Sequence, residues 1–532
     1  MRAPARSACF TGLAFLFFTI CQIAWADDCP NGILPPGTGQ DIVISVSCAV
    51  DGSAPNGLYQ YGNVNIIANG KLTFDDVKVD FWAKNILVEN NGSLLAGTTM
   101  PVGTNGGSLT IHLYGPDQGP GGKGVACVSD DKGQCGIPDN IWDSNGSEKV
   151  CLNGVQQNCS DGILDYFYQY MPIDYDDGNP QAYFGYKVLA VSYGGTLELF
   201  GAKGATYSNL PISSSGTSWA RLNASVTTTS NTLTLDRVVD WKNGDQIVVT
   251  TTDYLPGHSE QLTVTSNTVM GTYSVIGFKE TLQYPHNGQQ YPIAATVPAG
   301  IGPDPDPNLP PCNPQLPSLR CVDTRAAVGL LTHSIRIVSG GDTLLAPFPA
   351  ASTHYYFGGH TLFRQGFKAV EIQGVEFAQL GQGGKIMHYP VHFHMARITN
   401  PANTYVLDSS INESMTRWIV IHSTQDVTVA RNVGWESIGH GYYLEDGTEA
   451  YNKFYSNLGI FARAAVMASN NSAEKYNPRH VPGILAAPYP AGGSAQPQEQ
   501  VPYHSDVDHP TDFWITNGWN DFGYNHMAGA GT

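Results

Sequence analysis

Short segments with alternating apolar and polar residues recur along the chain, and a glycine turn introduces each of them. Clear examples are Gly70-Lys71-Leu72-Thr73-Phe74 and Gly195-Thr196-Leu197-Glu198-Leu199. Strict alternation predicts strands with one buried face, because successive side chains of a strand point to opposite sides. Within residues 60–115 the units recur with a period of about 20 residues, which is typical of a solenoid.

A second series of repeats follows later in the chain. Similar fragments begin at Gly374, Ser410, Asn432 and Asn457, separated by 22 to 36 residues. One coil of a parallel β-helix has roughly this length when its turns carry insertions. No helical periodicity of comparable length accompanies them. The pattern therefore predicts an all-β protein built as a parallel β-helix.

The N-terminus has the features of an export signal. Arg2 and Arg6 precede an apolar run, and the small residues of Ala24-Trp25-Ala26 follow it. We interpret residues 1–26 as a signal peptide, with a membrane anchor as the alternative. No later stretch reaches transmembrane length, so we expect a secreted, extracellular protein, or a periplasmic one if the source is bacterial.

The remaining chain is expected to fold as two domains. A β-rich domain is predicted for residues 27–200, interrupted by a loop-like, cysteine-containing insertion at 118–182. A β-helix domain is predicted for residues 201–532, with truncation at its C-terminus as the alternative to a complete domain.

Eight cysteines follow the signal peptide, an even number that predicts disulfides in an exported protein. They are Cys29, Cys48, Cys127, Cys135, Cys151, Cys159, Cys312 and Cys321. We expect the pairs Cys29–Cys48 and Cys312–Cys321, and two bridges within the middle four. A zinc site is the alternative for those four, although their spacing fits zinc knuckles poorly.

The charge balance excludes one large class of partners. Lys and Arg number 27 against 45 Asp and Glu, which gives a formal net charge of −18. Nucleic acids require a basic binding surface, so we expect no nucleic-acid partner.

Three segments of the second series carry the candidate chemistry at alternate positions. They begin at Val391, Ile419 and Tyr442. The interior side is expected to hold Val391, Phe393, Met395, Ile419, Ile421, Tyr442 and Leu444. The outer side is expected to hold His392, His394, His422, Tyr443 and Glu445.

If the coils stack in this register, His394, His422 and Glu445 form a column with steps of roughly 4.8 Å. His440 lies in the turn before the third segment, and Asp446 points to the opposite side if that strand is regular. Such a column could bind a zinc-like divalent cation through His392, His394, His422, His440 and Glu445. It could instead be an acid–base site at a glycosidic bond, with His394, His422, Glu445 and Asp446 as catalytic residues. A stack of purely structural hydrogen bonds is the third interpretation. Tyr443, Asp253 and Glu260 are weaker candidates for substrate binding.

Collinear motifs resemble one known family. They include Gly195-Thr196-Leu197-Glu198-Leu199, Tyr389-Pro390-Val391-His392-Phe393-His394 and Leu444-Glu445-Asp446-Gly447. In this order they resemble the family of CEMIP and transmembrane protein 2, the cell-surface hyaluronidase, with an N-terminal eight-glycine (G8) domain.

The resemblance implies a right-handed parallel β-helix of the pectin-lyase-like type, preceded by the G8 domain. It also implies a polysaccharide partner, hyaluronan or another glycan, with calcium as a cation. We therefore expect a hyaluronidase-like glycosidase or a polysaccharide lyase. The alternative is a glycan-binding or adhesive protein without catalysis.

Overall fold

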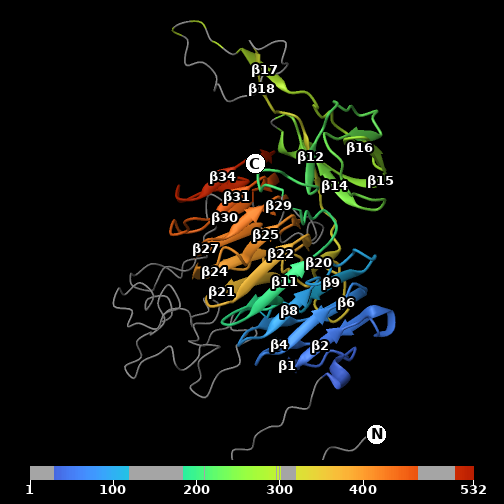
Figure 1. Ribbon diagram of the computed structural model, residues 1–532, viewed down its shortest axis with the longest axis vertical. Helices are drawn as coiled ribbons and strands as arrows, with labels where there is room; N and C mark the ends of the chain where they lie inside the picture. The colour runs from blue at the N-terminus through green and yellow to red at the C-terminus, as the bar shows by residue number, and fades with distance from the viewer. Residues whose placement is uncertain are drawn as a thin grey trace, which may run out of the picture.

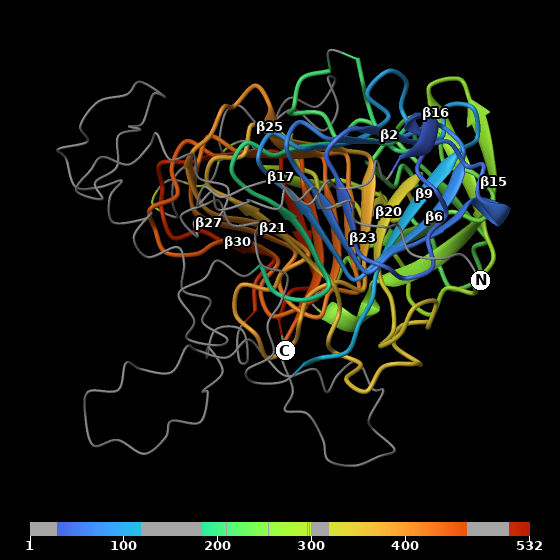
Figure 2. The same cartoon turned by 90° about the horizontal axis from the view of Figure 1, so that it is seen from below.

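Parallel strands stack into three walls that enclose one elongated apolar interior (Figure 1). The computed structural model describes residues 29–118, 184–208, 210–253, 255–294, 296, 298, 300, 319–464 and 510–531. The parallel β-helix expected from the sequence is confirmed. Viewed along the stack, the walls form the sides of one cross-section (Figure 2).

Each coil contributes one strand to each wall, and that strand is hydrogen-bonded to the strands of the neighbouring coils. The first wall contains, in order of pairing, β1 (Ile42–Ile44), β4 (Asn63–Ile66), β7 (Asn85–Val88), β10 (Val188–Val191), β21 (His360–Arg364), β24 (Val391–Ile398), β27 (Ile419–Gln425), β30 (Tyr442–Leu444) and β33 (Phe513–Trp514). The second wall contains β2 (Ser47–Val50), β5 (Lys71–Phe74), β8 (Ser93–Ala96), β11 (Thr196–Phe200), β22 (Ala369–Gln373), β25 (Thr404–Leu407), β28 (Thr428–Ala430), β31 (Lys453–Tyr455) and β34 (Asp521–Gly523). The third wall contains β3 (Leu58–Gln60), β6 (Lys78–Ala83), β9 (Ser108–Leu113), β20 (Ile335–Ser339), β23 (Val375–Ala378), β26 (Ser410–Asn412), β29 (Val433–Ile438), β32 (Leu458–Arg463) and β35 (His526–Ala528).

Alternation along each strand produces this architecture. In β5 the side chains of Leu72 and Phe74 are buried, whereas Lys71 is exposed. The register then places Leu72 beside Leu94 of β8, and Leu94 beside Leu197 of β11. Each coil buries its apolar side chains against those of the next, which stabilises the stack as nearest-neighbour contacts do in other solenoids.

The sheets run across residue 200, where the sequence suggested a boundary between two domains. Strand β11 pairs with β8 on one side and with β22 on the other, so both predicted domains contribute to the same wall. The ladder of hydrogen bonds is continuous because Thr196–Phe200 and Ala369–Gln373 are in register. Strands from the predicted range 27–200 and strands from the range after it therefore belong to one solenoid.

An antiparallel module interrupts one coil between β11 and β20. Its six-stranded sheet has the order β12 (Trp219–Arg221), β19 (Ala327–Leu330), β14 (Gln246–Val249), β15 (Glu260–Met270), β16 (Tyr273–Phe278) and β13 (Thr232–Thr234). Strands β17 (Tyr291–Ala294) and β18 (Leu319–Val322) form a separate antiparallel pair. This part of the predicted range 201–532 thus differs from the β-helix expected for it.

The module packs against the third wall. Trp219 and Val248 of the module form one buried cluster with Val433 and Leu458 of the wall. Its own core lies on the other side of its sheet and includes Trp241 and Ile276. The two apolar faces explain why the module is held at the side of the solenoid (Figure 1).

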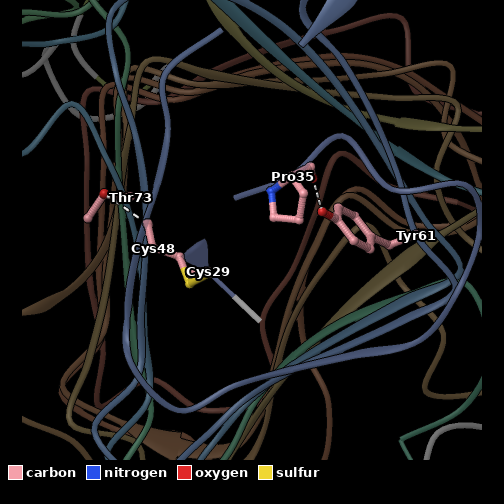
Figure 3. Close-up of a disulfide and its surroundings, with 5 residues drawn as sticks. All are labelled: Cys29, Pro35, Cys48, Tyr61 and Thr73. Carbon is pink, nitrogen blue, oxygen red and sulfur yellow. Dashed lines mark hydrogen bonds between the residues drawn. A yellow bond between two sulfur atoms is a disulfide. The ribbon is translucent and has the colours of Figure 1, made fainter. Parts of the chain in front are cut away.

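The N-terminal end of the tube is covered by its own first residues. Cys29 precedes the short 3₁₀ helix η1 (Pro30–Gly32) and forms the predicted disulfide with Cys48 of β2. The hydroxyl of Tyr61 donates a hydrogen bond to the carbonyl of Pro35. Figure 3 shows Cys29 and Pro35 inside the outline of the coils, with Thr73 donating to the carbonyl of Cys48 at 3.2 Å. This segment shields the first coil from water. Further 3₁₀ turns are η2 (Pro55–Gly57) and η4 (Pro256–His258).

Replacing Cys29 and Cys48 together by serine should lower the free energy of unfolding by about 3 kcal/mol, given a loop closed over 19 residues. The covalent link restricts the unfolded chain and also fixes the cap. Denaturant unfolding of the double variant and the wild type without reductant measures the difference. Equal midpoints would contradict a stabilising role for this bridge.

The other predicted disulfides are only partly visible. Cys321 is disulfide-bonded, and its predicted partner, Cys312, lies outside the described residues. The four middle cysteines also lie outside them, as does the predicted signal peptide. Within the described residues, no helix has the length and apolar character needed to cross a membrane.

One buried carboxyl group should make stability depend on pH. Asp512 is fully buried, and its Oδ1 accepts a hydrogen bond from the backbone N–H of Ala462 at 3.2 Å. Burial raises the pKa of Asp512 to about 7. The folded state therefore holds a proton that the unfolded state releases near pH 4, so stability falls as the pH rises from 4 through 7.

Asp512→Asn should remove this dependence, because the amide stays neutral. We expect the variant to gain stability relative to the wild type by roughly 3 kcal/mol between pH 5 and pH 8. Urea unfolding at both pH values measures it. A constant difference between the two proteins would contradict the assignment.

Candidate functional site

Adjacent coils bring His394 and His422 together on the outer side of the first wall. Strands β24 and β27 pair in register, with Phe393 opposite Ile421 and His394 opposite His422. The two imidazole rings lie 5.0 Å apart, and their Nδ1 atoms are separated by 3.2 Å. The predicted vertical neighbours therefore occupy the predicted positions.

The interior side of the alternation also agrees with the sequence prediction, with one exception. The tube core contains Val391, Phe393, Ile419, Ile421, Tyr442 and Leu444. Met395 is outside that cluster and has a φ of 50°. The register of β24 shifts directly after His394, because the coil turns its corner there. The prediction of an interior Met395 is therefore wrong.

His392 joins the two stacked histidines to form a compact group. One ligand atom from each of His392, His394 and His422 lies within 4.8 Å of the others. Nδ1 of His392 is 2.9 Å from the carbonyl oxygen of Met387, to which it donates as N–H. The lone pair is then on Nε2, which is buried and has no hydrogen-bond partner among the described residues.

Glu445 directly follows β30 and reaches the group from the third coil. Its Oε2 lies 3.7 Å from Nδ1 of His422, and its Oε1 lies 3.7 Å from Nη1 of Arg417. The Tyr389 hydroxyl donates to the same Oε1 at 3.4 Å. Oε2 is buried without a hydrogen-bond partner among the described residues. In Glu445, Oε1 is therefore fixed by Tyr389 and Arg417, whereas Oε2 faces His422.

Asp446 also approaches His422, contrary to the expectation that it would point away. Its Oδ2 lies 3.4 Å from Nε2 of His422 and accepts a hydrogen bond from the Ser423 hydroxyl at 2.6 Å. Strand β30 ends at Leu444, so the alternation no longer applies, and the turn at Gly447 (φ 86°) redirects the chain. Both carboxylates therefore flank His422.

The three imidazoles have different proton affinities. Burial, followed by the neighbouring histidines, holds the pKa values of His392 and His394 well below the ordinary value. Burial also acts to lower the pKa of His422, but the negative charges of Glu445 and Asp446 outweigh it and raise that pKa. The site thus combines two imidazoles whose pKa values are lowered with one whose pKa is raised.

Burial acts to raise the pKa of Asp446, but hydrogen bonds from His422 and its neighbours outweigh it, and the net pKa lies below the ordinary value. Burial and the adjacent Asp446 raise the pKa of Glu449. Glu449 accepts a hydrogen bond from the backbone N–H of Ser423 at 2.8 Å. This bond links the turn that follows His422 to the next coil.

Other predicted site residues lie elsewhere. The structure does not bring His440 into the three-histidine group: its Nδ1 accepts the backbone N–H of Thr511 at 3.0 Å, and its ring lies 4.6 Å from that of Trp514. Tyr443 faces outward as expected, but the residue is only 7% exposed, and the Arg417 guanidinium lies 3.6 Å from the centroid of its ring. It is therefore packed, and does not present an open stacking surface.

Asp253 and Glu260 belong to the antiparallel module and serve contacts within it. Asp253 lies 2.8 Å from Nδ1 of His258, and Glu260 lies 2.8 Å from Nε2 of His286. Because the module packs on the third wall, neither residue joins the histidines of the first wall.

Sequence reasoning missed Arg417 and Tyr389. Arg417 is 1% exposed, and it donates from Nη1 to the Tyr389 hydroxyl at 3.0 Å. Tyr389, Arg417 and His440 each stand two positions before the first aligned residue of their strands. Extending the alternation backwards by two residues would have placed them on the interior side, with Val391, Ile419 and Tyr442. The structure instead packs Tyr389 with Val420 and Tyr443, outside the core of the tube.

Two family models match this chain. The G8 domain model matches residues 25–128, and the CEMIP beta-helix model matches residues 356–532, which include every residue of the histidine site. Together the two matched ranges cover just over half of the chain.

Several curated proteins are similar to it in part. A G8 domain-containing protein of Dictyostelium discoideum is 30% identical over 356 residues, covering 65% of this chain and 24% of its own length. Cell surface hyaluronidase CEMIP2 of Homo sapiens is 30% identical over 241 residues, covering 44% of this chain and 15% of its own length. The cell migration-inducing and hyaluronan-binding protein of Mus musculus is 29% identical over 259 residues, covering 46% of this chain and 17% of its own length.

The chain thus spans less than a third of the length of these relatives. Among solved structures, the tailspike protein gp49 of Pseudomonas phage LKA1 is 11% identical, with 51% of this chain and 45% of that chain covered and a TM-score of 0.15. The two matched models and these relatives confirm the resemblance seen in the sequence, a G8 domain followed by a CEMIP-type β-helix.

Proposed function

We propose that this chain is an extracellular enzyme that depolymerises hyaluronan or a related polysaccharide at the outer side of the first wall. The observation that carries the proposal is the group of three imidazoles within 4.8 Å, with His422 flanked by Glu445 and Asp446. The relatives named for hyaluronan support the substrate class and the extracellular location.

Breaking a glycosidic bond requires a proton at the leaving oxygen and negative charge near the developing positive charge of the sugar. The pKa of His422 is raised by the two carboxylates beside it, which suits this residue to the first task. The Oε2 of Glu445, which accepts no hydrogen bond within the described part of the chain, suits that residue to the second. We assign proton transfer to His422 and charge stabilisation to Glu445, with His394 and Asp446 positioning them.

The same groups also suit elimination, in which a base removes a proton next to a carboxylate of the sugar and the bond breaks without water. The products distinguish the two reactions. Hydrolysis yields saturated ends, and elimination yields an unsaturated end that absorbs ultraviolet light.

A divalent cation held by the three histidines is the second candidate for the chemistry of this site. The buried Nε2 of His392 favours it. This atom has no hydrogen-bond partner among the residues that the structure describes, and the Met387 carbonyl fixes its tautomer, as a second partner does in many metal-binding histidines. Imidazole donors fit a zinc-like ion, whereas calcium takes six to eight oxygen ligands. A zinc-like ion at this place would supply Lewis acidity toward a glycan or water oxygen.

Thermal unfolding separates these possibilities without relying on activity. If the histidines bind zinc, added Zn²⁺ should raise the unfolding temperature of the wild type, as ligands specific for the folded state do. The His394→Ala variant should lose that rise, and Ca²⁺ should cause none through this site. No difference between the wild type and the variant with Zn²⁺ would exclude the metal site.

The function itself is tested by incubating the protein with hyaluronan and with a neutral polysaccharide, with and without chelator. We expect size-exclusion chromatography to show progressive shortening of hyaluronan. Binding of hyaluronan without shortening would contradict the enzyme and support the alternative of a non-catalytic, adhesive glycan-binding protein.

A further inference from the structure

A groove of about 410 Å³ lies on the third wall, away from the histidine site on the first wall. Three parts of the fold line it: strands β6, β9, β20 and β23 with the end of β26, the loop between β20 and β21, and strands β14 and β15 of the antiparallel module. These strands occupy the right side of the cross-section in Figure 2, next to β15 and β16. Clefts between two packed bodies are frequent ligand sites.

The floor of the groove is one outward-facing column of side chains. The register places Trp82, His112, Val338, Ala378 and Asn412 in succession on adjacent strands. Trp82 and His112 stack at 4.1 Å with an interplanar angle of 4°. The small side chains of Val338 and Ala378 follow and leave a hollow before Asn412. The floor is therefore aromatic and aliphatic at one end and polar at the other.

The polar groups of the groove are planar and fixed by pairing. Arg336 and Glu376 form a two-pronged ion pair, with two N–O distances of 2.9 Å. Glu376 is buried, whereas the Arg336 side chain is 42% exposed and so presents its guanidinium to the groove. Gln379 donates to Glu413 at 2.7 Å across neighbouring coils.

The module contributes a fixed amide from the opposite side. Gln261 accepts a hydrogen bond from the indole N–H of Trp435 at 3.2 Å and donates to Gln246 at 3.2 Å. Donors and acceptors that are already held in place lose little conformational entropy when a ligand binds.

We propose that this groove binds a short neutral oligosaccharide. The aromatic and aliphatic floor suits the C–H faces of sugar rings, and the fixed amide, carboxylate and guanidinium groups suit pairs of neighbouring hydroxyls. Glu376 and Glu413 outnumber Arg336 among the charged residues that line it, so a polyanion is disfavoured. An added peptide strand is also disfavoured, because the floor is a sheet face whose backbone groups already pair with neighbouring strands.

This site is independent of the proposed function, because it lies on a different wall and shares no residue with the histidine group. The test is isothermal titration calorimetry of the wild type with neutral hexasaccharides of glucose and of N-acetylglucosamine, and with a hyaluronan oligosaccharide as the acidic probe. We expect binding of a neutral probe that is at least tenfold weaker in Gln379→Ala and in Ala378→Leu, which fills the hollow.

Gln283→Ala is the matched control, because Gln283 is an exposed glutamine that does not line the groove. It should bind like the wild type, as should Glu445→Gln. Unfolding temperatures identify any variant that fails to fold. If Ala378→Leu does not fold, the affinity of Gln379→Ala decides whether the groove binds the probe, since this substitution only shortens a side chain. Absence of neutral-probe binding by the wild type, unchanged affinity in Gln379→Ala, or preference for the acidic probe at this groove would overturn the proposal.

Discussion

Glu445→Gln is expected to lower the rate of hyaluronan depolymerisation by roughly 100-fold or more, the usual scale for losing one electrostatic interaction that stabilises the transition state. The amide keeps the shape of the side chain and its contact with the Tyr389 hydroxyl, but it removes the negative charge 3.7 Å from His422. The loss should therefore be in kcat, measured per folded molecule. The unfolding temperature should fall as well, because the buried Arg417 loses its charged partner. Reducing-end release under saturating substrate measures kcat.

Glu371→Gln is the matched control for this prediction. Glu371 faces outward from β22 on the second wall, where it accepts a hydrogen bond from the Tyr405 hydroxyl at 2.6 Å. It should keep full activity. Wild-type rates in Glu445→Gln, or equal losses in both variants, would remove Glu445 from the mechanism.

Arg417→Ala is expected to combine the second large loss of activity with a clear loss of stability. Arg417 is buried between Tyr389 and the ring of Tyr443, and its positive charge faces Glu445. Removing one partner of a buried, charged network leaves the other uncompensated, which should cost roughly 3 kcal/mol of unfolding free energy. Without the guanidinium, Glu445 also loses the contact that orients its Oε1, so activity per folded molecule should fall.

The activity and stability of Arg417→Lys should lie between those of the wild type and of Arg417→Ala, because lysine keeps the charge but not the planar, stacking group. Arg431→Ala separates stability from catalysis, since Arg431 is similarly buried and pairs with Asp408 at 2.6 Å. It should lose stability while the folded fraction keeps its rate. If Arg417→Ala behaved in the same way, Arg417 would be a purely structural residue.

The fold was largely predictable because alternation and period are local properties of the sequence. The burial of Leu72, Phe74 and Leu197 follows directly from the glycine-initiated repeats. The antiparallel module could not be predicted, because apolar and polar residues alternate along its strands in the same way as along those of the coils. Only the partner of each strand distinguishes them: β14 pairs with β15 and β19 in antiparallel ladders, whereas β11 pairs with parallel neighbours.

The prediction of the candidate site succeeded where strands are regular and failed where strands end. Stacking of His394 on His422 needed only the register of β24 and β27. Met395 and Asp446 were misplaced because each lies at the corner of a coil, where alternation stops. Arg417 was missed because a charge beside an apolar run gives no sign of burial until the aromatic residues above and below it are known.

A double-mutant cycle of His394→Ala and Glu445→Gln most directly tests whether side chains from separate coils form one catalytic unit. Residues that act as a unit have strongly non-additive effects on kcat. We predict that the double variant loses little more activity than the worse single variant. Losses that multiply across the two substitutions would show that the two residues act independently, and would contradict a shared centre on the first wall.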